Sequence, residues 1–83
     1  MWKIQYTRNA AKAILKLDHS IRDRIKKEIE NLESDPNLGK QLTGALSGLR
    51  SLRVGDYRVI YKKEFDELII LIITIGHRKS IYD

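Results

Sequence analysis

The feature that most constrains the fold is an apolar run at residues 68–75 (LIILIITI). Apolar side chains occupy both parities of this run, whereas a half-exposed strand would alternate apolar with polar residues. The run is also much shorter than the roughly 18 or more apolar residues that indicate a membrane-spanning helix. We therefore expect a central strand that is covered on both faces.

The first half of the chain predicts a strand and two helices. Residues 2–6 alternate apolar with polar side chains, which is the period of a strand. The apolar spacing becomes helical over residues 8–17, where Thr7 offers an N-cap hydroxyl. A second helix follows and ends at Pro36, the only proline; its apolar positions are Ile21, Ile25, Ile29 and Leu32. Because about two or three residues join the helices, they should form an antiparallel pair.

The second half predicts a loop and three strands. Residues 35–48 hold three of the five glycines, which is typical of a long loop. Residues 50–54 and 57–63 are rich in β-forming side chains, and Gly55-Asp56 between them suits a tight hairpin turn. With the apolar strand that follows, these segments predict a three-stranded antiparallel meander.

The predicted fold class is α+β. Hydrophobic residues make up 42% and charged residues 33% of the sequence, a composition that favours a folded domain over a disordered chain. We expect one domain over residues 1–83. Its N-terminal strand, helical hairpin and meander should form one mainly antiparallel sheet with the helices on one face.

Basic residues concentrate on the predicted sheet. The chain carries 16 Lys and Arg against 11 Asp and Glu, for a net charge of +5. Residues 49–63 and 76–82 together hold seven bases and one acid, Asp56, so this surface should attract a polyanion. A regular hairpin places Arg53 directly opposite Arg58, which is destabilising unless an anion such as phosphate lies over the pair. The alternatives are that both side chains splay into water, or that a bulge removes the pairing.

The available side chains restrict the chemistry. The absence of Cys excludes thiolate nucleophiles, disulfides and Cys-based metal sites, and His19 and His77 lie on separate elements, so we expect no metal and no cofactor. RNA can be cut when a ribose 2′-hydroxyl attacks the adjacent phosphate, a reaction that cations around the phosphate accelerate. Arg58, Arg78 and Tyr82 provide parts of this chemistry, and His77 is a candidate for proton transfer. A structural role for His77 and base stacking by Tyr82 are the alternatives.

Two motifs resemble a known family. Residues 52–61 (LRVGDYRVIY) and 75–82 (IGHRKSIY) are similar to the RelE/ParE superfamily of toxins from toxin–antitoxin pairs. The order of predicted elements also resembles this superfamily over nearly the whole chain. The resemblance implies that Arg58 stabilises the scissile phosphate and that Arg78 stabilises charge and protonates the leaving group. It also implies that Tyr82 stacks on the RNA and orients the attack.

The RelE branch of this superfamily comprises endoribonucleases that cut messenger RNA in the ribosomal A site. The resemblance therefore implies a metal-independent ribonuclease of a type II toxin–antitoxin system, which acts on the ribosome and its mRNA and is held inactive by a cognate antitoxin. Without a signal-peptide pattern or a membrane-spanning segment, we expect a cytoplasmic protein. The alternatives are a ParE-like inhibitor of DNA gyrase and a catalytically weak RNA-binding relic. The expected additional RNA contacts are Arg50, Arg53, Lys62, His77 and Lys79.

The sequence departs from the RelE pattern at the general base. The best-known RelE enzymes carry two lysines on the strand before the arginine hairpin, where this chain has Leu49 and Ser51. Arg50, Lys40 or Lys62 could take over this role. Arg50, however, lies between these two positions in the sequence. In a regular strand its side chain therefore points to the opposite face of the sheet.

Overall fold

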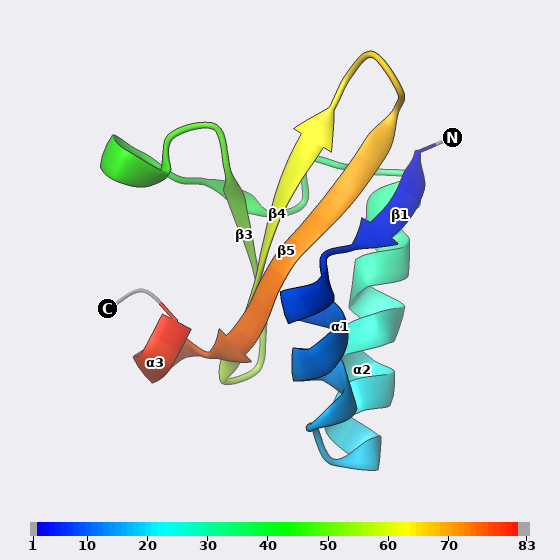
Figure 1. Ribbon diagram of the computed structural model, residues 1–83, viewed down its shortest axis with the longest axis vertical. Coiled ribbons are helices and arrows are strands. Elements are labelled where there is room, and N and C mark those ends of the chain that lie inside the picture. The colour runs from blue at the N-terminus through cyan, green and yellow to red at the C-terminus, as the bar shows by residue number, and fades with distance from the viewer. Residues whose placement is uncertain (1, 82–83) are drawn as a thin grey trace.

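The computed structural model describes residues 2–81, with side chains for residues 2–79. The helices and strands follow one another as in Figure 1, and the predicted α+β class is confirmed. In chain order they are β1 (Lys3–Tyr6), α1 (Arg8–Leu15), α2 (His19–Glu30), the 3-10 turn η1 (Asn31–Glu33), β2 (Lys40–Gln41), the 3-10 turn η2 (Gly44–Leu46), β3 (Arg50–Val54), β4 (Tyr57–Glu64), β5 (Ile69–His77) and α3 (Arg78–Ile81).

The strands form one sheet in the order β1-β5-β4-β3-β2. Strands β3, β4 and β5 pair antiparallel as the predicted meander, and β1 pairs with β5 in parallel. Parallel neighbours need a long crossover connection, which here is the whole chain between the two strands. β5 is therefore a central strand, as its apolar sequence predicts.

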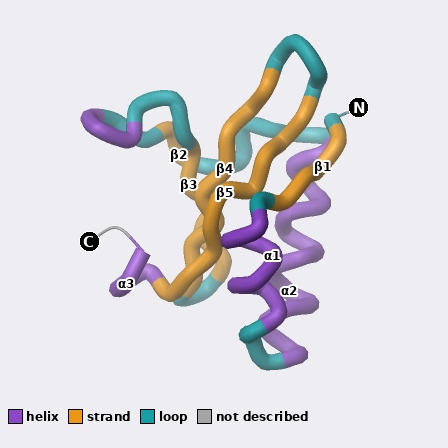
Figure 2. The backbone as a smooth tube through the Cα atoms, viewed as in Figure 1, coloured by secondary structure: helices purple, strands orange, loops and turns teal. Residues whose placement is uncertain are grey.

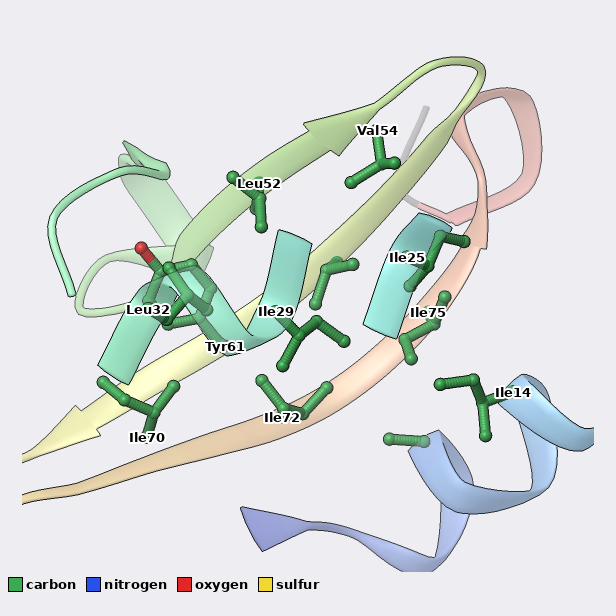
Figure 3. Close-up of a cluster of buried hydrophobic side chains, with 12 residues drawn as sticks. Ile14, Ile25, Ile29, Leu32, Leu52, Val54, Tyr61, Ile70, Ile72 and Ile75 are labelled. Atoms are coloured by element: carbon green, nitrogen blue, oxygen red, sulfur yellow. The ribbon is translucent and has the colours of Figure 1, made fainter. Parts of the chain in front are cut away.

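Helices α1 and α2 pack on the same face of the sheet, which we call the inner face. Ile25 and Ile29 of α2 and Leu32 of η1 are fully buried in one hydrophobic cluster with the sheet. Figure 3 shows these side chains between the helices and the strands, together with Ile72 and Tyr61. Because burial of one such aliphatic side chain contributes about 1.5–3 kcal/mol, this seam holds α2 on the sheet.

The start of α1 is tied to β5. The Thr7 hydroxyl accepts a hydrogen bond from the Ala10 N–H at 3.1 Å, which confirms the predicted N-cap. The same hydroxyl donates to the Ile73 carbonyl at 2.6 Å. The pairing of β4 with β5 shifts by one residue here, because Ile60 lies opposite Thr74 whereas Tyr61 lies opposite Ile72. Ile73 is thus the extra residue of a β-bulge, and Thr7 binds its carbonyl.

Three details differ from the sequence-based expectations. The segment predicted as a loop over residues 35–48 contains β2 and η2, because a strand this short shows no periodicity. The second helix begins at His19 and passes into η1 at Asn31, so it ends before Pro36. The expectation that both faces of β5 are covered was also wrong. Ile70 and Ile72 are buried on the inner face, but side chains of the other parity, Ile69, Leu71 and Ile73, are only half-buried.

Among residues 2–81, no helix combines the length and the apolar character needed to cross a membrane.

Candidate nucleic-acid interface

Arg53 and Arg58 lie directly opposite each other on the β3–β4 hairpin, as predicted. The turn between the strands is regular, and its Gly55 has φ +61°, a left-handed conformation that glycine adopts without steric cost. Val54 and Val59, which follow the two arginines in sequence, pack into the core. Because successive side chains of a strand alternate between faces, both arginines lie on the side of the sheet away from the helices.

We call this side of the sheet the outer face. Strand alternation and cross-strand register assign to it, from β3 and β4, the side chains of Ser51, Arg53, Arg58, Ile60, Lys62 and Glu64. Arg53 is exposed, and its Nε donates to the Gly55 carbonyl at 3.3 Å. Arg58 is half-buried, and its Nε is shielded from solvent. Two opposed cations therefore lie on this face beside the hairpin turn, and like charges in such a pair are destabilising.

Arg78 is tied to the same hairpin. Gly76 of β5 lies opposite Arg58, and Arg78 follows two positions later as the first residue of α3. The backbone N–H of Arg78 donates to the carbonyl of Asp56 in the hairpin turn at 2.8 Å. In Figure 2, α3 and the segment that contains η2 both extend from the sheet on the side away from α1 and α2. The backbone of Arg78 is therefore tied to the hairpin that carries Arg53 and Arg58.

Two of the predicted RNA-contacting residues lie on the inner face. His77 is opposite Tyr57, whose ring packs against the core, and the two rings meet edge to face with centroids 5.6 Å apart. The Arg50 guanidinium donates to the Gly39 carbonyl at 2.7 Å. No bulge interrupts the pairing of β3 with β4, so Arg50 keeps the parity expected from the sequence. The structure thus does not bring His77 or Arg50 together with Arg58.

The other predicted residues are distributed along the outer face and its edge. Lys62 lies on the outer face, where its Nζ is 3.4 Å from Glu64 in a largely exposed ion pair. Such pairs are weak, contributing about 0–1 kcal/mol. Lys79 is exposed on α3, and its backbone N–H donates to His77 Nδ1 at 3.2 Å. Tyr82 lies outside the described residues.

Two residues of the outer face, Ser51 and Lys40, could not be assigned to it from the sequence. Ser51 is 5% exposed, and its hydroxyl has no hydrogen-bond partner among residues 2–79. Lys40 of β2 is directly opposite Ser51, which places it on the outer face as well. A periodicity search cannot find β2, because two residues define no period. Of the three candidates for the missing lysines, Lys40 and Lys62 lie on the outer face and Arg50 does not.

The arrangement suits the binding of an extended anion rather than an enclosed ligand. A hollow of about 220 Å³ lies between α2 and the hairpin turn, on the inner side of the sheet and away from the arginines. The described part of the chain contains no group of three metal-ligating side chains. Burial raises the pKa of the Tyr61 phenol, so this core tyrosine is neutral and is not available as a base. The outer face therefore offers cations and hydrogen-bond donors outside any enclosed cavity, around two residues, Ser51 and Ile60, that are each only 5% exposed.

Comparisons with known proteins agree with this architecture. The sequence matches the family described as "ParE toxin of type II toxin-antitoxin system, parDE" over residues 4–82. No protein with a curated function matches the sequence.

Solved structures of toxin–antitoxin complexes are similar in fold. A chain of the RelB–RelE antitoxin–toxin complex from Methanococcus jannaschii is 30% identical, with 94% of each chain covered and a TM-score of 0.74. A chain of the RelBE2 complex from Mycobacterium tuberculosis is 26% identical, with a TM-score of 0.85 over 93% of this chain and 98% of that one. A chain of the archaeal RelE–RelB complex from Pyrococcus horikoshii OT3 is 25% identical, with a TM-score of 0.76 over 96% and 98%.

The family match spans nearly the whole chain, and the similar solved chains share its fold over 93% or more of this chain. The chain therefore belongs to the ParE toxin family of type II toxin–antitoxin systems, with a RelE-like fold within the RelE/ParE superfamily.

Proposed function

We propose that this toxin is a ribosome-dependent endoribonuclease that cuts messenger RNA in the A site. The observation that supports this function is the opposed pair of Arg53 and Arg58 on the outer face, with Arg78 tied to the same hairpin. A guanidinium matches phosphate oxygens through its planar fork of donors. A phosphate that binds over the pair would be attracted by both guanidinium groups and would offset their mutual repulsion.

In the proposed reaction, the ribose 2′-oxygen attacks the adjacent phosphorus. The 2′-hydroxyl gives up its proton as the new P–O bond forms, and the bond from phosphorus to the 5′-oxygen breaks. The 5′-oxygen then takes a proton, which leaves a 2′,3′-cyclic phosphate and a 5′-hydroxyl end. Because the RNA supplies its own nucleophile and no electrons are exchanged, the chain need only position the backbone, stabilise charge and allow proton transfer.

The roles that we propose for the residues are those that the family resemblance implies, and the described positions of Arg58 and Arg78 are compatible with them. Arg58 on the outer face holds the scissile phosphate and stabilises the charge that develops on its oxygens. Arg78, beside the hairpin turn, stabilises the leaving 5′-oxygen as this atom takes its proton. Tyr82 stacks on the RNA. Neighbouring phosphates are contacted by Arg53, Lys62 and Lys79.

We also propose a cognate antitoxin as the protein partner. The similar chains from M. tuberculosis, P. horikoshii and M. jannaschii were each solved as toxin–antitoxin complexes. In this chain the net charge is +5, and Leu71 and Ile73 of β5 are half-buried away from the helices. An acidic chain with apolar side chains would match both properties. Binding of such a chain to the outer face would block access to Arg58.

Inhibition of DNA gyrase is the second candidate function. The family match to ParE toxins of parDE systems favours it. In that case the chain would bind gyrase as a protein ligand and cut nothing, and the arginine hairpin would contribute to a protein interface.

The deciding experiment maps the 5′ ends of one messenger RNA after incubation with the purified toxin, with the RNA either naked or on ribosomes with an empty A site. We expect new ends only on ribosomes, at A-site codons. Arg58→Ala should remove them. Arg8→Ala should not, because it removes the same charge from the exposed first turn of α1. If a growth-arresting toxin cuts neither sample, the nuclease proposal is wrong, and a gyrase supercoiling assay tests the second candidate.

A further inference from the structure

We propose that Lys40 is an RNA-binding residue of the outer face, where it forms one cationic band with Arg53 and Arg58. This inference rests on the proposed function, since it assumes that the outer face binds RNA. It adds a residue from β2, a strand whose presence the sequence did not reveal.

The register of three neighbouring strands defines the band. Lys40 of β2 is opposite Ser51 of β3, and Arg53 lies two residues further along β3 on the same face. Such diagonal neighbours are about 7–8 Å apart, which long side chains can bridge. Arg53 is in turn opposite Arg58 of β4. The three cations therefore follow a diagonal line across β2, β3 and β4.

The position of Lys40 is fixed by the residue before it. The N–H of Gly39 donates to the Tyr61 phenol oxygen at 2.9 Å, and the Gly39 carbonyl accepts from Arg50 at 2.7 Å. A Cβ atom at position 39 would lie 2.6 Å from Cε1 of Tyr61, so the backbone here packs directly on a core ring. These contacts hold Gly39 on the inner side, and alternation then directs the next side chain, Lys40, to the outer face.

The charge of Lys40 is available to a ligand. Lys62, the other outer-face lysine of the strands, is already near the carboxylate of Glu64. Lys40 is exposed, and no ion pair within residues 2–79 involves it. Ser51, the outer-face residue of β3 opposite Lys40, is small and only 5% exposed, so its side chain does not project beyond those of Lys40 and the arginines. An ammonium is a point charge with three donors on a flexible stem, which suits a phosphate next to the one bound by the arginines.

A contact to a neighbouring phosphate affects binding more than chemistry. Each phosphate contact to single-stranded RNA adds about 0.7 to the slope of log affinity against log salt concentration. Lys40→Gln should therefore lower this slope by about 0.7 and weaken RNA binding irrespective of sequence. In ribosomal cleavage, the same variant should raise KM more than it lowers kcat, because the contact is made in both the ground state and the transition state.

The test measures fluorescence anisotropy of a single-stranded 2′-O-methyl RNA over a series of KCl concentrations. This RNA lacks the attacking hydroxyl, so binding is measured whether or not the toxin is a nuclease. The variants are Lys40→Gln, Arg53→Gln and the double variant K40Q/Q41K. The double variant restores the net charge, but Gln41 is opposite Arg50, which places the new lysine on the inner face.

We expect both single variants to bind RNA more weakly and with a smaller slope of log affinity against log salt concentration. The double variant should behave like Lys40→Gln. An unchanged slope in Lys40→Gln, or full recovery in K40Q/Q41K, would overturn the assignment, since recovery would mean that only net charge matters. These results are independent of cleavage. If the toxin cuts no RNA but Lys40→Gln lowers the salt dependence of RNA binding as expected, the nuclease proposal is wrong and the RNA-binding role of Lys40 is supported. If Lys40→Gln cleaves and binds RNA like the wild type, only the proposed role of Lys40 is wrong.

Discussion

The backbone N–H of Gly39 donates a hydrogen bond of 2.9 Å to the phenol oxygen of Tyr61, a side chain that is fully buried on β4. The same phenol donates to the Pro36 carbonyl at 2.7 Å. The hydroxyl of a core residue thus provides hydrogen-bond partners for a backbone N–H and a backbone carbonyl in the segment that leads into β2. Because Lys40 follows Gly39 directly, the hydrophobic core and the outer face are linked through this one hydroxyl.

Tyr61→Phe should lower the free energy of unfolding by about 1–3 kcal/mol, because a donor and an acceptor of the backbone lose a buried partner while the ring volume is kept. Urea denaturation measures the change. Tyr6→Phe is the matched control, since Tyr6 lies at 37% exposure and should change stability by less than about 0.5 kcal/mol. Equal effects of the two substitutions would show that the Tyr61 hydroxyl does not stabilise the fold.

The same hydroxyl predicts a pH dependence. Burial raises the pKa of Tyr61 above its ordinary value of 10.0. The unfolded chain therefore loses this proton at a lower pH than the folded chain, so the folded state binds more protons between the two pKa values. Stability must then fall as the pH rises from 10.0 through the raised pKa. The stability difference between the wild type and Tyr61→Phe should shrink over this window in parallel urea titrations, and a constant difference would contradict it.

Gly39→Ala tests the packing of the same segment. The added methyl group would lie 2.6 Å from Cε1 of Tyr61, so either the ring or β2 has to move, at a cost of about 1–3 kcal/mol. Hydrogen exchange should show faster exchange of the Leu42 amide, which follows β2 directly and donates to the Leu49 carbonyl of the neighbouring chain segment at 2.9 Å. Gly44→Ala is the comparison, because it has φ +67° but no atom within 4 Å of the new Cβ. Its cost is conformational, so the Leu42 amide should exchange as it does in the wild type.

Arg53→Gln should have opposite effects on stability and on RNA binding. It removes one of two directly opposed cations, so unfolding should become harder by up to about 1 kcal/mol. RNA affinity should fall, because a phosphate contact is lost. Arg8→Gln loses the same charge without relieving an opposed cation and should change neither quantity appreciably. A loss of stability in Arg53→Gln would mean that the pair is not a source of strain in the free toxin.

The elements that could be predicted from the sequence are those with a local signal. The apolar run around Ile72 marked the central strand, and Gly55-Asp56 marked the hairpin and with it the opposed arginines. The N-cap at Thr7 was predictable for the same reason, because a hydroxyl just before a helical pattern is a local feature.

The elements that could not be predicted depend on contacts between distant residues. β2 is defined by its pairing with β3, and Tyr61 and Arg50 bind the backbone of Gly39 just before it; nothing in residues 35–48 alone indicates those contacts. The face of His77 likewise depends on its register with Tyr57 across two strands. A count of basic residues therefore predicted one positive surface, whereas the pairing of the strands divides those residues between two faces.

The sharpest test of the proposed chemistry is Arg58→Lys, which keeps the charge but removes the planar fork of donors. An ammonium cannot make the paired hydrogen bonds that a guanidinium makes to phosphate oxygens, so the rate of cleavage on ribosomes should fall clearly while RNA binding stays within a few-fold. Single-turnover cleavage and anisotropy with 2′-O-methyl RNA measure the two quantities separately. Arg53→Lys is the matched control, because Arg53 is exposed and is proposed to contact a neighbouring phosphate, where a point charge suffices. Wild-type cleavage by Arg58→Lys would exclude a bidentate phosphate contact and reduce the role of Arg58 to that of a positive charge.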